Sequence, residues 1–217
     1  HQAASPVICA VEDREDNLWL GTQGGGLQRW QPKRVQTLSA GNGLAHESTW
    51  ALCEHTDGSV WIGTDGGISH LKAGQVTNYT EAHGLSRNTL RALALDQAGT
   101  LWIGTGSGLN SFRDGQLLSH PFPGEWFEGK IRAILPTRDG ALWVGTPLGL
   151  HRLEGSQQTK FTTADGLPHD DVRSLLEDRA SNLWIGTFGG GLCKLGVPPS
   201  GGQFVVPPSG GPGLNST

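Results

Sequence analysis

The stretch Leu183-Trp184-Ile185-Gly186-Thr187 decides the fold, because its pattern of Trp, an aliphatic residue, Gly and Thr occurs five times along the chain. Successive tryptophans are 42, 41, 41 and 41 residues apart. Self-similarity at a fixed period of this length is the signature of a repeat architecture. The tryptophans are Trp19, Trp61, Trp102, Trp143 and Trp184, and the glycines of the pattern are Gly21, Gly63, Gly104, Gly145 and Gly186.

Each of the first four repeats contains four short runs of strand-forming residues, the fifth contains three, and none has a helical period. In the fifth repeat an apolar run at 172–177 precedes the Trp run, and a third run at 192–195 follows a glycine cluster. Four strands of about five residues in about 41 are typical of one blade of a β-propeller. The sequence therefore predicts an all-β fold over residues 1–196, a propeller of five four-stranded blades whose inner strands start near residues 7, 49, 90, 131 and 172.

The tryptophans are expected to lie between neighbouring blades, where each would bury on the order of 200 Å². The glycine after each Trp would let the next blade approach closely. Five such blades could form a closed ring or part of a larger one. We favour the closed ring, because an open arc would expose apolar blade faces at its two ends.

The last segment differs in composition from the repeats. Residues 197–217 are rich in Pro, Gly and Ser and contain Pro-Pro-Ser-Gly-Gly twice, so we expect a tail or linker. Residues 203–206 could still supply the outer strand of the fifth blade. The chain begins at His1 and has no Met, so we expect a fragment of a longer protein.

Composition excludes several classes of partner. The 217 residues are 35% hydrophobic and 17% charged, which is typical of a globular protein, and no apolar run reaches the ~18 residues of a membrane helix. A net charge of -4 without a basic cluster argues against nucleic acid, and we expect no membrane contact by this segment. Cys9, Cys53 and Cys193 lack zinc-site spacing and are expected to be buried thiols.

The fifth repeat also has the most complete set of flanking residues. Glu177-Asp178 precedes the Trp run, and Gly189-Gly190-Gly191-Leu192 follows it. This order resembles the two-component regulator propeller repeat, which forms the sensor β-propeller of hybrid histidine kinases and related receptors. The resemblance extends over residues 1–195.

The resemblance implies a periplasmic or extracellular input domain of a bacterial membrane receptor. Such domains commonly have seven blades per ring and are joined through a β-sandwich and a membrane helix to an output module, a histidine kinase or a diguanylate cyclase. This chain departs from that pattern by having five units and no output module.

Few residues point to catalysis. The chain contains no nucleophile elbow, zinc-peptidase, P-loop or EF-hand motif, so we predict no catalytic residue, metal or cofactor. Asp13, Asp96 and Asp178 recur six residues before a Trp and are expected to accept hydrogen bonds within turns. The sequence His169-Asp170-Asp171 has no spaced partner for a metal and is expected to be a solvated loop.

The loops around one mouth of the propeller axis are the predicted binding site. Polar residues stand where the chain enters the inner strands, and a second ring follows each Gly-Thr. A selective pocket requires different side chains at one repeat position on a constant scaffold. The candidates are His46, Glu47, Arg87, Asn88, Trp126, Glu128, His169 and Asp170, with Gln23, Asp65 and Phe188 in the second ring.

These observations predict a non-enzymatic sensor that binds a small polar or carbohydrate ligand at the axial mouth. One alternative is a propeller enzyme, a lyase or glycosidase, for which Glu47, Glu128 and Asp170 would supply the carboxylates. Another alternative is a protein-interaction scaffold.

Overall fold

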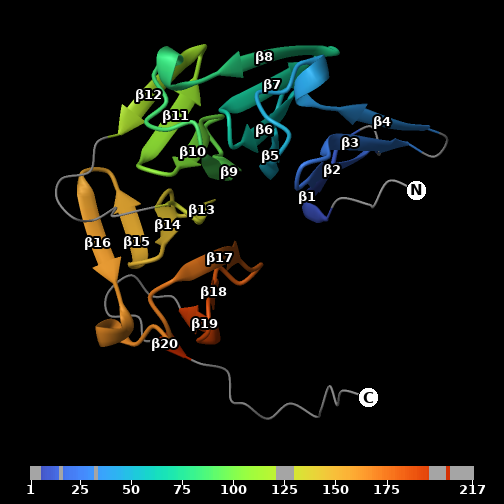
Figure 1. Cartoon of the computed structure of the whole chain (residues 1–217). Coiled ribbons are helices and arrows are strands. Elements are labelled where there is room, and N and C mark those ends of the chain that lie inside the picture. Colours follow the sequence, from blue (N-terminus) through green and yellow to red (C-terminus); the bar gives the residue numbers. More distant parts are fainter. Residues whose placement is uncertain (1–5, 15–16, 32–33, 121–129, 196–203, 206–217) are drawn as a thin grey trace, which may run out of the picture.

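The computed structural model describes residues 6–14, 17–31, 34–120, 130–195 and 204–205. Within these ranges the strands form five antiparallel sheets of four, and each sheet takes its strands in chain order. This arrangement is the predicted five-bladed all-β propeller (Figure 1). None of the described helices is long and apolar enough to cross a membrane.

The bounds of the strands are as follows. The first blade consists of β1 (Val7–Glu12), β2 (Leu18–Thr22), β3 (Gly26–Gln31) and β4 (Arg34–Leu38). The second consists of β5 (Thr49–Glu54), β6 (Val60–Thr64), β7 (Ile68–Lys72) and β8 (Gln75–Tyr79). The third consists of β9 (Leu90–Leu95), β10 (Leu101–Thr105), β11 (Leu109–Arg113) and β12 (Gln116–His120). The fourth consists of β13 (Ala133–Pro136), β14 (Leu142–Thr146), β15 (Gly149–Glu154) and β16 (Gln157–Phe161). The fifth consists of β17 (Val172–Glu177), β18 (Leu183–Thr187), β19 (Gly191–Leu195) and β20 (Phe204–Val205).

The strands β20 and β13 bear on the predicted strand positions. The short strand β20 pairs with β19 and lies within the segment 203–206. The inner strand β13 begins later than position 131, because the Ile131 N–H bonds to the Thr105 carbonyl of the preceding blade rather than within its own sheet.

A carboxylate organises the turn before the Trp strand in three blades. Asp178 accepts a hydrogen bond from the Asn182 backbone N–H at 2.9 Å and another from Trp184 Nε1 at 2.9 Å. The prediction of turn-capping acceptors is confirmed, and the same carboxylate also fixes the indole. The matching indole bonds are Trp19 to Asp13 at 2.7 Å and Trp102 to Asp96 at 2.9 Å.

Apolar side chains of adjacent blades form the core. Each blade has an N-side face toward the preceding blade and a C-side face toward the next. Between the first two blades, Trp19 and Leu27 on a C-side face pack with Val60 and Ile62 on an N-side face. Trp19, Trp61, Trp102 and Trp143 are therefore wedges between blades, as predicted, whereas Trp184 lies on the C-side face of the last blade in the series.

The glycine after the Trp permits this close contact. A Cβ added at Gly104 would lie 2.5 Å from Cγ2 of Ile131 in the next blade, and one at Gly145 would lie 2.7 Å from Cγ1 of Val172. Real Cβ contacts of that length do not occur without displacement of a neighbour, so these positions require glycine.

The five blades form an open arc rather than a closed ring. Consecutive inner strands β1, β5, β9, β13 and β17 contact one another in series, and Figure 1 shows the first and fifth blades separated at the two ends of the series. The expectation of a closed ring is therefore wrong. Because the repeats share one wedge geometry, the turn at each junction is set by those side chains, and four junctions do not complete a circle.

Exposure at the two ends agrees with the open arc. Leu192 on the C-side face of the fifth blade is 48% exposed, whereas its counterparts in the other repeats are at most 1% exposed. Leu18 on the N-side face of the first blade is 39% exposed, whereas its counterparts are at most 6% exposed. Both end faces thus have the composition of an inter-blade contact without a neighbouring blade.

The three cysteines are free. Burial raises the pKa of the thiols of Cys9, Cys53 and Cys193 to about 11. These thiols are therefore protonated at neutral pH. Cys193 is buried in the core, as predicted, whereas Cys9 and Cys53 are only partly buried.

Candidate functional site

The loops that enter the inner strands lie against the loops that follow Gly-Thr, at one end of the axis. A Cβ added at Gly66 would be 3.0 Å from Cβ of His46, and one at Gly190 would be 2.8 Å from Cβ of His169. A Cβ at Gly106 would be 3.6 Å from Cγ of Arg87. In three blades the structure therefore brings a predicted loop residue onto the neighbouring loop of the same blade, and we call this end of the molecule the axial face.

Three of the predicted site residues hydrogen-bond to the backbone of their own loops. The side chains of Glu47, Asn88 and Asp170 each accept a hydrogen bond from a backbone N–H seven residues earlier in the chain, at 3.0, 2.7 and 2.6 Å. These donors begin the short 3-10 turns η1 (Ala40–Asn42), η2 (Glu81–His83) and η4 (Thr163–Asp165). The structure thus gives these three side chains a role in closing the loop, and their recurrence at one repeat position is the sequence signal for it.

The two histidines of the prediction share one geometry. His46 Nδ1 accepts a hydrogen bond from the Ser48 backbone N–H, and His169 Nδ1 accepts one from the Asp171 backbone N–H, both at 3.0 Å. Each ring is thereby oriented by its own loop, which leaves Nε2 as the nitrogen available for another contact.

The remaining candidates differ in placement. Trp126 and Glu128 lie outside the described residues. Gln23 is exposed beside the first inner strand, where its backbone N–H bonds to the Pro6 carbonyl. Asp65 and Phe188 contact charged residues that the sequence analysis did not select.

Those charged residues are arginines at one repeat position beside the propeller axis, eleven residues before the repeat Trp. The residues at this position are Ile8, Trp50, Arg91, Arg132 and Arg173, of which all but Arg132, directly before β13, lie in an inner strand. In the second and third blades, Arg91 Nη1 lies 3.0 Å from Oδ1 of Asp65, and its guanidinium carbon lies 3.6 Å from the centroid of the Trp50 ring. Arg91 is thus held between a carboxylate and an aromatic face.

The fourth and fifth blades have arginines at the same repeat position. Asp171 accepts two hydrogen bonds from Arg173, Nε to Oδ1 at 2.9 Å and Nη2 to Oδ2 at 2.7 Å. Arg132 Nε is 3.7 Å from the same Oδ1, and the Arg173 guanidinium carbon is 4.6 Å from the centroid of the Phe188 ring. We refer to Trp50, Asp65, Arg91, Arg132, Asp171, Arg173 and Phe188 as the axial cluster.

Charge in the axial cluster is unbalanced toward the positive. Three guanidinium groups face two carboxylates, in a chain whose formal net charge is -4. Burial lowers the pKa of Arg91, Asp65 opposes that shift, and the charge of Arg132 lowers the pKa further. Arg91 remains a cation at neutral pH, and the charge of Arg132 is among those that act on it.

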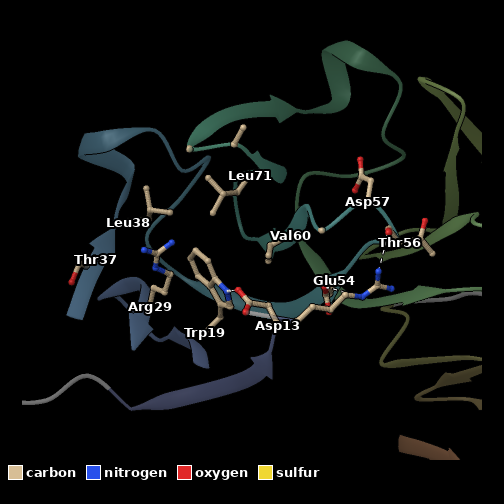
Figure 2. Close-up of a pocket in the computed structure, with 14 residues that line it drawn as sticks. Asp13, Trp19, Arg29, Thr37, Leu38, Glu54, Thr56, Asp57, Val60 and Leu71 are labelled. Atoms are coloured by element: carbon tan, nitrogen blue, oxygen red, sulfur yellow. Dashed lines mark hydrogen bonds and ion pairs between the residues drawn. The ribbon is translucent and has the colours of Figure 1, made fainter. Parts of the chain in front are cut away.

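A cleft of about 790 Å³ lies at the opposite end, between the first and second blades (Figure 2). Trp19 and Arg29 line it, with 5.5 Å between the guanidinium carbon and the ring centroid. Leu71 lines the cleft at the position where the next repeat has Phe112, whose ring centroid lies 4.7 Å from that of Trp61. Arg14 also lines the cleft, where it pairs with Glu54 and donates a hydrogen bond to the Thr56 carbonyl.

The sequence pattern of the two component regulator propeller family matches residues 2–24, 43–66, 84–107, 126–147 and 166–189, more than half of the chain. The chain belongs to this family. Each matched segment ends at the loop after Gly-Thr, so the family pattern includes the loops and the inner-strand wall of the axial face. No curated protein matches the chain significantly.

Two similar solved structures are extracellular domains of two component systems. The extracellular domain of the hybrid two component system BT3049 from B. thetaiotaomicron is 26% identical, with a TM-score of 0.76 over 87% of this chain and 27% of that one. The extracellular domain of the hybrid two component system BT4673 from the same organism is 26% identical, with a TM-score of 0.75 over 94% of this chain and 28% of that one. The chain thus spans about a quarter of the length of these structures, and its similarity to them supports a sensor-domain role.

A third structure shares the fold alone. Virginiamycin B lyase from Staphylococcus aureus is 16% identical, with a TM-score of 0.74 over 92% of this chain and 69% of that one. Identity at this level carries no statement about catalysis.

Proposed function

We propose that this chain is the ligand-sensing part of an extracytoplasmic receptor and that a small polar ligand of the sugar class binds at its axial face. The observation that carries the proposal is the family match over all five repeats, joined to extracellular domains of hybrid two component systems among its structural relatives. An output module elsewhere in the receptor, a histidine kinase or diguanylate cyclase, would receive the signal.

The geometry of the axial face supports binding rather than catalysis. The carboxylates of Glu47 and Asp170 accept backbone hydrogen bonds within their loops, and Asp171 is engaged by Arg173. A glycosidase or lyase needs carboxyl groups free to exchange protons with a substrate. His46 and Arg87, by contrast, project from loops without filling the core, as residues that bind a soluble ligand do.

A screen of neutral and acidic monosaccharides and oligosaccharides, read by saturation-transfer NMR on this chain, tests the proposal. For a ligand that binds, we expect His46→Ala and Arg87→Ala to weaken affinity by roughly tenfold, because each removes a hydrogen bond worth about 1.5 kcal/mol. The melting temperature should not change, because both residues lie on surface loops.

Arg179→Ala is the matched control, because Arg179 is exposed on the turn between β17 and β18, at the other end of the blade. Unchanged affinity in both axial variants, or an equal loss in the control, would show that the ligand binds elsewhere.

A further inference from the structure

The axial cluster contains a guanidinium that its carboxylates do not satisfy. Arg173 donates a hydrogen bond to each oxygen of Asp171. Arg91 Nη1 and Asp65 Oδ1 form an ion pair at 3.0 Å that lacks hydrogen-bond geometry. Arg132 is left at 3.7 Å from an oxygen already bonded to Arg173, and among the described residues its buried Nε has no hydrogen-bond partner. A half-buried guanidinium with an unpaired N–H donor favours the binding of an anion from solution.

The surroundings of Arg132 favour the binding of an anion. Its backbone N–H bonds to the Gly145 carbonyl at 2.8 Å, which fixes the position of the residue on the inner wall. Its side chain is 25% exposed, so the guanidinium is reachable from solvent but partly desolvated. A charge-assisted hydrogen bond in that setting is stronger than one on an open surface.

Neighbouring groups add charge and an apolar surface. The charge of Arg132 lowers the pKa of Arg91, and an anion bound at Arg132 would offset that repulsion. Phe188 is exposed, and Arg173 covers one side of its ring. The exposed part of this ring can receive the apolar face of a sugar.

We infer that the axial cluster binds the acidic group of an anionic sugar, with Arg132 as the principal contact to a carboxylate and Phe188 as the contact to the sugar ring. The inference rests on the proposed function and specifies its ligand class as a sugar acid rather than a neutral sugar. Planar carboxylates match the fork of donors on a guanidinium, which is why this class is favoured.

The test titrates the chain with D-glucuronate, D-glucose and D-glucose 6-sulfate and follows the arginine Nε–Hε signals by NMR. We expect glucuronate to shift the Arg132 signal, assigned by its loss in Arg132→Gln, and to bind at least tenfold more tightly than glucose. Arg132→Gln should reduce glucuronate affinity by roughly tenfold, and raising the salt concentration should weaken binding in the wild type.

Arg113→Gln is the control, because it removes the same charge from the exposed turn between β11 and β12. Equal affinity for glucose and glucuronate would overturn the inference and leave the proposed sensor function standing. Tighter binding of the sulfate ester than of glucuronate would overturn the carboxylate assignment, and no binding of either acid would overturn the site itself. Loss of all sugar binding in the wider screen would instead contradict the proposed function.

Discussion

At the scale of single residues, one carboxylate fixes the indole of the repeat tryptophan in three of the five repeats. In the first, third and fifth repeats an Asp six residues before the Trp accepts the indole N–H. The second repeat has His55 there, and Asp57 caps the turn through Ser59 instead. Trp61 is 2% exposed, and among the described residues no acceptor bonds to its Nε1. The second repeat therefore buries an indole N–H donor that is hydrogen-bonded in the first, third and fifth repeats.

We predict that His55→Asp stabilises the chain by about 1 kcal/mol, because the new carboxylate would accept the hydrogen bond from Trp61 Nε1. This increase in the free energy of unfolding is what remains of the new hydrogen bond after the loss of the His55 contacts and the repulsion from Asp57 are subtracted. Urea unfolding measures the stability, and slower exchange of the Trp61 indole proton would identify the bond.

Thr56→Asp is the control for this prediction, because it adds the same charge at an exposed neighbouring position. Equal stability of the two variants would show that charge, rather than the indole hydrogen bond, accounts for the effect.

At the scale of elements, the glycines of the Trp strands set how closely adjacent blades pack. Gly104 and Gly145 face side chains of the following inner strand at distances that leave no room for a methyl group. Gly41, in the loop turn η1, has only Ser39 Oγ within 4 Å, at 3.7 Å. The same substitution therefore has different costs at the two kinds of position.

We predict that Gly104→Ala destabilises the chain by about 2 kcal/mol, because Ile131 must move away from its contact with the third blade. Gly41→Ala should change stability by less than about 0.5 kcal/mol. Thermal unfolding of both variants is the measurement. A loss at Gly41 that equals the loss at Gly104 would contradict the inter-blade explanation.

The inner strands also show what the sequence could and could not predict about the site. The period, the four strands per blade and the wedge role of Trp follow from spacing alone, because each repeat must bury the same faces. The sequence predicts binding residues in the loops of the axial face. The cations of the axial cluster lie instead in the inner strands, at Arg91 and Arg173, or directly before one, at Arg132. Their common repeat position was a usable signal, but the pairing of Arg91 with Asp65 depends on how two blades pack and could not be deduced from spacing.

At the scale of the whole molecule, the arc has two faces that match each other. The C-side face of the fifth blade exposes Leu176 and Leu192, and the N-side face of the first blade exposes Leu18 and Trp30. At the four internal junctions the same repeat positions are packed against each other. Because the internal junctions show that the two kinds of face fit, the fifth blade of one copy can pack against the first blade of another in a head-to-tail contact.

The central claim, that five blades packed through four junctions build an open arc with two unpaired inter-blade faces, is tested most directly by sedimentation velocity over a range of concentrations. We predict association that increases with concentration, that is abolished by Leu192→Asp and that is retained in Leu118→Asp, an exposed leucine on the outer strand of the third blade. A single compact monomer at every concentration, or equal effects of the two variants, would contradict the open arc.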